Sequence, residues 1–306
     1  MLKMKIISLF LLIPISTLSL LFWSCTGATK EKQKKEAMAQ NTRPISSVDS
    51  TLFHFWDKFD MRDTAQVKNP EKGEQQLADF LQLLAQHPDS ATRDKAIDLM
   101  LDKAKVNRKS FDYFIKQYEH YLYDGNSPMR NDIVYESVLR YLIKTDLLSD
   151  LEKEAYRPIY KLVRQNKVGQ KAEDFSFELA NGQKQKLSEI NAKYSLLIFY
   201  DPDCSHCKET INQLRDTPQL VQLFNQLQIQ VVAIDPWGDR SKWKNYQSEL
   251  SYEWINGFDS ENKLLSFNLY DLKASPTIYL LDENKKVLLK DAYLQQVIAY
   301  FVKTNS

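Results

Sequence analysis

The sequence predicts an α/β domain, with a mixed central sheet flanked by helices, that lies C-terminal to an all-α domain. Three observations support this prediction. Apolar residues recur at helical spacing over residues 51 to 165, strand-like and helix-like segments alternate after Gly169, and a C-x-x-C pair, Cys204 and Cys207, stands between a strand-like segment and a helix-like one. The chain has 306 residues, 43% of them apolar, which is enough for about two domains with separate cores.

Residues 1 to 24 have the pattern of an export signal. The first five residues carry two lysines, and residues 6 to 23 form an uncharged segment rich in Leu and Ile. The segment ends at Ser24 and Cys25, and the stretch L-F-W-S-C resembles a bacterial lipoprotein signal. This resemblance implies that Cys25 is lipidated and anchors the protein in the bacterial cell envelope, facing the periplasm. An uncleaved transmembrane anchor is the alternative, because the 18 uncharged residues are enough to cross a bilayer.

Residues 25 to 50 are predicted to form a flexible tether. They are rich in Lys, Gln, Glu, Ser and Thr and contain too few apolar residues to fold alone. Such a segment lets a folded domain move near the membrane while it stays attached. The formal net charge of the chain is only +1, so the composition gives no indication of a nucleic-acid partner.

Residues 51 to 166 are predicted to form an all-α domain of five or six helices. Three segments have apolar residues at the spacing of one helix face. These residues are Leu77, Phe80, Leu81 and Leu84; Ile97, Met100, Leu101 and Ala104; and Phe111, Phe114, Ile115, Tyr118 and Leu122. We expect His54, His87 and His120 at the surface. No residue pattern in this domain indicates an activity.

Capping residues predict two helix starts in this domain. Ser127 is expected to cap a helix that has Pro128 at its first position, where proline is favoured. Ser149 and Glu152 have the spacing of a capping box, in which each side chain bonds to the backbone N–H of the other residue.

Residues 167 to 306 are predicted to alternate strands with helices. Strands are expected at residues 175 to 179, 195 to 200, 229 to 234, 278 to 281 and 287 to 289. Helices are expected at residues 205 to 214, after Asp239, at 261 to 267 and at 293 to 302. This order predicts a mixed sheet with helices on both faces.

The C-x-x-C pair indicates redox chemistry. Cys204 is expected at the N-terminus of a helix, where unpaired backbone N–H groups and the helix dipole favour the thiolate, the form that attacks disulfides. Cys207 lies almost one turn further on, on the same side of the helix. It can therefore attack the sulfur of Cys204 and release a mixed disulfide.

A zinc half-site and a structural disulfide are the alternatives for this pair. Zinc needs two more ligands, and outside the motif the chain has only Cys25, His54, His87 and His120, which are not spaced as a second ligand pair. A structural disulfide stays open, because exported proteins carry such bonds. We predict no metal and no cofactor.

Residues 168 to 305 resemble the thioredoxin superfamily, most closely the TlpA-like, membrane-tethered thiol:disulfide oxidoreductases of bacterial envelopes. The stretches that carry this resemblance are G-Q-K-A-E-D-F with the later N-G and L-S-E-I, L-L-I-F-Y-D-P-D-C-S-H-C-K, A-S-P-T-I-Y-L-L-D, and the closing hairpin and helix. It covers a little under half of the chain. The residues before it resemble an uncharacterised helical domain of Gram-negative envelope lipoproteins, which brings no known activity.

The resemblance implies roles for individual residues. Cys204 is the attacking thiol and Cys207 the resolving thiol, while Ser275 and Pro276 form the substrate-facing loop, with a cis bond before Pro276. The implied partners are proteins that carry a disulfide or dithiol, and an upstream thiol donor or acceptor. His206 is expected to modulate the pair, because an imidazolium near Cys204 stabilises its thiolate.

Proteins of this family carry an acidic residue that moves the proton of the resolving cysteine, and this sequence has no acid at either of the matching positions. Glu209 lies about 200° around the helix from Cys207, and Ile198 replaces the acid of thioredoxin six residues before the first cysteine. A peroxidase site on this scaffold needs Thr or Ser three residues before its cysteine, where this chain has Asp201 before Cys204. Two further hypotheses stay open: a binding module with a structural disulfide, and a copper-delivering site made of the motif's cysteines and histidine.

Overall fold

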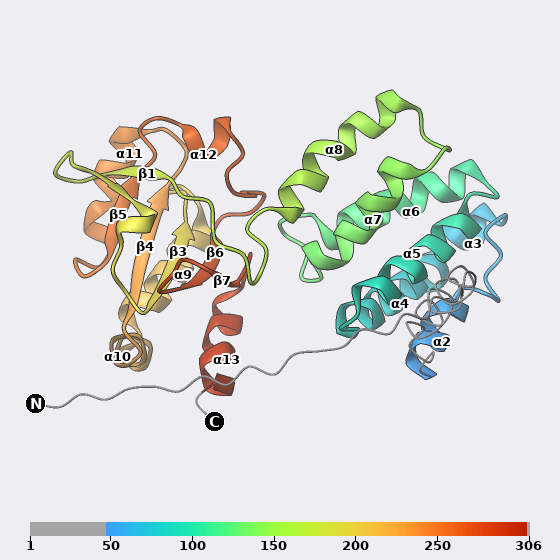
Figure 1. Cartoon of the computed structure of the whole chain (residues 1–306), viewed down its shortest axis with the longest axis horizontal. Helices are drawn as coiled ribbons and strands as arrows, with labels where there is room; N and C mark the ends of the chain where they lie inside the picture. The colour runs from blue at the N-terminus through green and yellow to red at the C-terminus, as the bar shows by residue number, and fades with distance from the viewer. Residues whose placement is uncertain (1–46, 305–306) are drawn as a thin grey trace, which may run out of the picture. The chain divides into compact units, whose positions relative to one another are not determined.

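The computed structural model describes residues 47 to 304, which belong to one compact unit (Figure 1). The predicted export signal, the lipidation site Cys25 and residues 26 to 46 of the predicted tether lie outside the described residues. Within residues 47 to 304, no helix is both long enough and apolar enough to cross a membrane.

The first part of this unit is all-α, as predicted, and runs from blue to light green in Figure 1. Its helices are α2 (Ser47–His54), α3 (Thr64–Val67), the π-helical turn η1 (Pro70–Glu74), α4 (Gln75–Gln86), α5 (Ser90–Ala104), α6 (Arg108–Leu122), α7 (Asp132–Lys144) and α8 (Asp150–Arg164). The three predicted apolar faces belong to α4, α5 and α6, and their residues are buried in one shared core. Their burial confirms the helical spacing read from the sequence.

Helix α7 begins later than predicted. Its N-cap is Asn131, whose side-chain oxygen accepts the backbone N–H groups of Ile133 and Val134 at 3.1 Å each. Ser127 instead donates its hydroxyl to the carbonyl oxygen of Tyr121, at 2.6 Å, near the end of α6. Its oxygen also accepts the backbone N–H of Met129 at 3.2 Å, but residues 128 and 129 form only a turn, so the predicted helix start at Ser127 is wrong.

Of three other predictions about the helical part, one is confirmed and two are corrected. The capping box of Ser149 and Glu152 is confirmed at the start of α8. The first helix begins at Ser47, inside the range that was assigned to the tether. The surface prediction is wrong for His87, which is buried, with its Nε2 atom 2.8 Å from Oδ1 of Asp49. This pair joins α2 to the residues that follow α4.

The second part is built on one mixed sheet, which confirms the predicted fold class. Its strands are β1 (Ser176–Leu179), β2 (Lys184–Lys186), β3 (Tyr194–Phe199), β4 (Ile229–Asp235), β5 (Ile255–Phe258), β6 (Thr277–Asp282) and β7 (Val287–Leu289). Their spatial order is β2-β1-β5-β4-β3-β6-β7. Strands β3, β4 and β5 are parallel, and β6 is antiparallel to β3. The strand that leads to the paired cysteines therefore lies inside the sheet.

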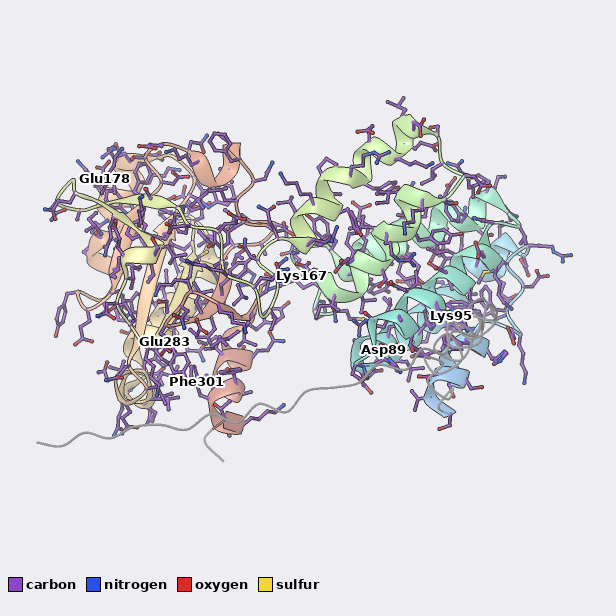
Figure 2. All side chains as sticks on the ribbon, in the orientation of Figure 1. Asp89, Lys95, Lys167, Glu178, Glu283 and Phe301 are labelled. Carbon is purple, nitrogen blue, oxygen red and sulfur yellow. The ribbon has the colours of Figure 1, made fainter. Side chains whose placement is uncertain are left out.

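Alternate residues of the central strands enter two separate cores. Leu196 and Ile198 of β3 pack into the first core, whereas Leu197 and Phe199 pack into the second. Four helices contribute to the first core: α9 (Ser205–Asp216), α10 (Pro218–Gln226), α11 (Arg240–Tyr246) and α13 (Leu294–Thr304). Phe301 of α13, labelled in Figure 2, is one of its buried residues. Only two short helical elements contribute to the second core: α12 (Lys263–Ser266) and the 3-10 turn η2 (Leu187–Glu189). The predicted helices on both faces of the sheet are therefore present, but those on the second face are short.

Helix α10 and strand β2 were not predicted. α10 starts with Pro218 at its first position, and its residues Leu220 and Phe224 pack into the first core. β2 is only three residues long and pairs with β1 at the edge of the sheet. Both elements carry weak sequence signals, because α10 has a single turn of apolar spacing and β2 has no apolar residue.

A group of buried charges, the ionic cluster, joins the helical part to the sheet domain. It consists of Arg130, Asp132, Lys273, Lys290 and Asp291, and Lys273 also pairs with the buried carboxylate of Asp271 at 3.0 Å. Asp132 pairs with Lys273 at 3.0 Å and with Lys290 at 2.8 Å, and Asp291 pairs with Arg130 at 2.9 Å and with Lys273 at 3.2 Å. None of the five side chains is more than 11% exposed. Burial opposes ionisation of Asp132, but Lys273 and Lys290 outweigh it and hold the pKa of this carboxyl below its usual value.

Candidate active site

Cys204 caps the N-terminus of α9, the position predicted from the sequence. Its backbone is extended, with φ −77° and ψ 123°, and its sulfur accepts the backbone N–H of Cys207 at 3.3 Å. This N–H is one of the donors that the first turn of a helix leaves without a backbone partner. The sulfur of Cys204 therefore lies where the helix offers a hydrogen bond to a thiolate.

Cys207 lies in a different environment. It is fully buried, and its sulfur accepts the backbone N–H of Asp201 at 3.5 Å. Burial raises the pKa of the Cys207 thiol, and the hydrogen bond from Asp201 only partly opposes this effect. Both cysteines are unpaired thiols in this structure.

The loop before β6 brings a second backbone group to Cys204. The bond between Ser275 and Pro276 is cis, as the resemblance implies. The Cys204 thiol donates a hydrogen bond to the carbonyl oxygen of Ser275, at 3.3 Å. The three residues that were expected to meet substrate, Cys204, Ser275 and Pro276, thus lie together.

His206 lies at the surface, and its ring pairs with Glu209. Its side chain is 75% exposed, and its Nδ1 atom lies 3.4 Å from Oε2 of Glu209. Glu209 is equally exposed, in agreement with its predicted position away from Cys207. The carboxylate of Glu209 attracts any positive charge on this imidazole, so its influence on the thiolate of Cys204 is weaker than the motif alone suggests.

Aromatic and amide side chains lie beneath the cysteines, and the sequence analysis missed them. Tyr200 is fully buried and donates its hydroxyl to Oδ1 of Asn256 at 3.1 Å. Trp243 of α11 donates its indole N–H to the same oxygen, also at 3.1 Å. The ring of Tyr246 lies 5.6 Å from that of Tyr200. Burial is the main cause that raises the pKa of Tyr246, and the neighbouring Cys207 is a smaller one.

Asp235 is a buried carboxyl at the end of β4, the strand beside β3. Residues 229, 231 and 233 of β4 pack into the core that α9 also lines, and Asp235 is next in that alternation. Its Oδ1 atom accepts the backbone N–H of Trp237 at 2.9 Å. Burial raises the pKa of Asp235 to about 6. The sequence carries a signal for it, because an acid that ends a buried strand, here I-Q-V-V-A-I-D, is unusual.

Two further acids flank the motif at the surface. Oδ1 of Asp201 accepts the backbone N–H of Asp203 at 2.8 Å. Lys242 of α11 pairs with the carboxylate of Asp203 and holds the pKa of this carboxyl below its usual value. The ion pair neutralises one of the two negative charges near Cys204.

A groove of about 300 Å³ is lined by Ser275, whose carbonyl oxygen contacts the Cys204 thiol, and we call it the thiol groove, although Cys204 itself does not line it. Helix α9 contributes His206, Glu209, Thr210 and Gln213. The segments before β6 and before α13 contribute Ala274, Ser275, Pro276, Ile278, Ala292, Tyr293, Leu294 and Gln295. The loop between α6 and α7 of the helical part contributes Gly125, Asn126 and Arg130. Residues 47 to 304 contain no group of three or more His, Cys, Asp or Glu side chains arranged to hold a metal ion.

Two family models match the chain. Residues 33 to 166 match the domain of unknown function DUF5106, and residues 168 to 290 match the AhpC/TSA family. No curated protein matches the chain at a significant level.

Solved structures are similar to the whole chain or to its C-terminal part. A thioredoxin-like protein from Bacteroides caccae is 35% identical, with a TM-score of 0.79 over 86% of this chain and 95% of that chain. The C-terminal domain of an uncharacterized protein from Bacteroides fragilis is 40% identical over 45% of this chain and 98% of that chain, with a TM-score of 0.44. The thioredoxin domain of a thiol-disulfide oxidoreductase from Bacteroides vulgatus is 20% identical over 45% and 97%, with a TM-score of 0.38.

The fold, the cysteine pair and the cis-proline loop define a thioredoxin-like domain. The similarity to the Bacteroides caccae protein extends across both parts of the molecule. The chain belongs to the thioredoxin-like proteins, with an AhpC/TSA-type domain at the C-terminal end and a DUF5106 helical domain before it.

Proposed function

We propose that this protein is a thiol:disulfide oxidoreductase of the bacterial cell envelope, which acts on protein disulfides through Cys204 and Cys207. The observation that carries this proposal is the contrast between the two sulfurs. Cys204 is half-buried and lies between the N–H of Cys207 and the carbonyl group of Ser275, whereas Cys207 is fully buried. An accessible thiol beside a buried one is the arrangement that attack and internal resolution require.

The exchange conserves atoms and electrons in two steps. In the reducing direction, the thiolate of Cys204 attacks one sulfur of the substrate disulfide, a mixed disulfide forms, and the departing substrate thiolate takes up a proton. Cys207 then gives its proton to solvent and its thiolate attacks the sulfur of Cys204, and the second substrate sulfur leaves as a thiolate that takes up a proton. Two electrons have passed to the substrate, and the pair is left as a disulfide. A dithiol donor must reduce the pair before the next turnover, and an oxidised pair runs the same steps in reverse.

Burial of Cys207 supports this order of events. The raised pKa of Cys207 keeps this thiol protonated before substrate arrives. Cys204 is partly exposed whereas Cys207 is fully buried, so Cys204 is the sulfur that a substrate reaches first. The backbone N–H of Asp201, 3.5 Å from the sulfur of Cys207, is placed to stabilise the thiolate that forms during resolution.

The envelope location rests on the N-terminal sequence pattern alone. We propose that Cys25 is acylated and tethers the folded unit to a membrane through residues 26 to 46. Growth with a labelled fatty acid should label the wild-type chain and leave Cys25→Ala unlabelled. A wild-type chain that stays in the membrane without label would instead support the uncleaved anchor.

The AhpC/TSA match also raises peroxide reduction, which the site does not favour. A peroxidase site of this type needs a hydroxyl three residues before its reactive cysteine. Asp201 occupies that position, and its carboxylate accepts the N–H of Asp203. Hydrogen peroxide consumption by the wild-type chain should therefore not exceed that of Cys204→Ser.

Insulin reduction by dithiothreitol tests the proposed function. The wild-type chain should accelerate the reaction, and Cys204→Ser should return it to the uncatalysed rate. Cys25→Ser is the matched control, because it replaces a cysteine outside the motif. Unchanged turnover in Cys204→Ser would exclude the assignment and leave the binding-module hypothesis.

A further inference from the structure

The loop between α6 and α7, residues 123 to 131, packs directly against the segment that precedes the cis-proline. Gly125 lies close to this segment. A Cβ atom at this position would lie 2.4 Å from the carbonyl oxygen of Lys273 and 3.1 Å from the Cβ atom of Ala274. Contacts this short leave no space for a side chain, so glycine allows the two backbones to meet.

Hydrogen bonds hold this loop in place from both of its ends. At the beginning of the loop, Tyr123 donates its hydroxyl to Oδ1 of Asp271 at 3.2 Å. At its end, Arg130 donates to the hydroxyl oxygen of Tyr293 at 2.6 Å and to the carbonyl oxygen of Gly125 at 2.9 Å. The guanidinium of Arg130 also stacks 4.1 Å from the centre of the Tyr293 ring.

The ionic cluster fixes the same contact at a third point. Lys273, two residues before Ser275, reaches Asp132 in the first turn of α7. Lys290 pairs with Asp132 and also donates to the carbonyl oxygen of Val163 at the end of α8. The helical part is therefore attached to the cis-proline segment through buried charges, for which separation is costly.

This attachment makes the helical part a wall of the thiol groove. Gly125 and Asn126 line the groove together with α9 and the Ser275 segment. Asn126 is exposed, and its backbone N–H donates to Oδ1 of Asp124 at 2.8 Å, which holds the turn. A chain that lies in the groove, beside the Ser275 carbonyl group that contacts Cys204, therefore lies against this asparagine.

The size and lining of the groove define what it can accept. A volume of about 300 Å³ is at the lower end of small-ligand pockets, so it accommodates a short extended segment and not a folded surface. Its polar lining is mainly uncharged, with Asn126, Thr210, Gln213 and Gln295 among the residues that supply hydrogen-bonding groups. Extended polypeptide has free N–H and C=O groups that match such a lining.

We propose that the α6–α7 loop of the helical domain selects the substrate, by admitting to Cys204 only disulfides carried on an extended, flexible polypeptide segment that fits the thiol groove. This inference rests on the proposed function. It gives the helical domain a role in specificity, which its sequence alone does not indicate. Asn126 is then a specificity-determining residue that touches the substrate chain without taking part in the exchange of sulfur bonds.

Asn126→Trp, which fills the groove, tests this inference in the full chain. Asn284→Trp is the matched control. Asn284 is also an exposed turn asparagine, and its N–H donates to Oδ1 of Asp282 at 2.9 Å. It follows the end of β6 that pairs with Tyr194, so it lies at the far end of the sheet from Cys204.

Two disulfides of different size provide the readout: insulin, as a polypeptide disulfide, and hydroxyethyl disulfide, which needs no groove. Asn126→Trp should lower kcat/KM for insulin at least about tenfold more than for hydroxyethyl disulfide, which corresponds to about 1.4 kcal/mol of lost discrimination. Asn284→Trp should change neither value by more than about twofold.

The other outcomes are distinguishable. Equal losses for both disulfides in Asn126→Trp, or no loss for insulin, would overturn the inference while leaving the proposed function intact. A wild-type chain that reduces neither disulfide would overturn the proposed function, and the inference with it. Asn126→Ala is a second variant, in case the tryptophan variant misfolds. It widens the groove. The ratio of kcat/KM for a bulkier, cyclic peptide disulfide to kcat/KM for insulin should therefore be higher than in the wild type.

Discussion

The thiol of Cys204 and the carbonyl oxygen of Ser275 lie 3.3 Å apart, although the two residues are separated by 71 positions in the chain. The segment that carries Ser275 also carries Lys273, which pairs with Asp132 of the helical part at 3.0 Å. The reactive thiol and the helical part therefore contact the same short loop. A change in either contact is expected to affect how a substrate chain lies beside Cys204.

Cys207→Ser should trap the reaction at its first step. Without a resolving thiol, the bond between Cys204 and the substrate sulfur persists. A mixed disulfide should accumulate with insulin and be visible by mass spectrometry under non-reducing conditions. The double variant Cys204→Ser, Cys207→Ser should form none, and an adduct in that variant would show that another residue reacts.

Asp235→Asn should stabilise the protein at neutral pH and not at acidic pH. Burial raises the pKa of Asp235 to about 6 in the folded state, against about 3.9 in an unfolded chain. The stability that this group contributes is thus fully present below about pH 4 and is lost as the pH rises through about 6. Asparagine has no charged form, so the free energy of unfolding should rise by about 1 to 3 kcal/mol at pH 8 and change little at pH 3.5.

Urea unfolding from pH 3.5 to pH 8 measures this effect. Asp146→Asn is the control, because that side chain is 97% exposed. A constant difference between Asp235→Asn and the wild type across the pH range would contradict the assignment of a raised pKa to Asp235.

Asp132→Asn should destabilise the unit by about 3 to 5 kcal/mol, because it leaves the buried charges of Lys273 and Lys290 with less compensation. The folded-state pKa of Asp132 is lowered, so its contribution is present above about pH 4 and is lost as the pH falls below that. The difference from the wild type should therefore shrink in acid. Denaturant unfolding at pH 7 and in acid measures it.

Asp150→Asn is the matched control for this change. Asp150 is 96% exposed and 3.9 Å from Lys153, so its loss should cost less than about 0.5 kcal/mol. Similar losses in the two variants would mean that the ionic cluster does not stabilise the junction.

Gly125→Ala should lower the free energy of unfolding by about 1 to 3 kcal/mol, because the added methyl group meets the carbonyl oxygen of Lys273. Asn126→Ala, in the same loop but exposed, should stay within about 0.5 kcal/mol of the wild type. Thermal unfolding of the three chains makes the comparison. A Gly125→Ala chain as stable as the wild type would show that the loop can move away from the cis-proline segment.

The sequence predicts elements whose signal is local. Strand β7 begins and ends where the apolar run V-L-L predicts it, and α11 begins after Asp239, whose carboxylate caps it. Spacing and capping depend on neighbours in the chain, so these elements are visible without a tertiary structure. The C-x-x-C pair and the Ser275-Pro276 loop were located in the same way, and the resemblance connected them.

The rest of the site depends on contacts between distant residues. Asp132 and Lys273 are 141 positions apart, and each is an ordinary surface charge when judged from its neighbours. The sequence also places His206 between the two cysteines but does not show where its side chain is directed, so its ion-pair partner Glu209 could not be predicted. The contribution of the α6–α7 loop to the thiol groove could not be predicted for the same reason.

The reduction potential of the Cys204 and Cys207 pair tests the central claim most directly. The full chain is equilibrated in glutathione buffers of increasing oxidising strength, and free thiols are trapped and counted under native conditions. Our account predicts a reversible two-electron transition with a midpoint between roughly −270 and −120 mV, the range of known exchange proteins. A pair that stays oxidised in every buffer, and becomes accessible only after unfolding, would contradict it and identify a structural disulfide.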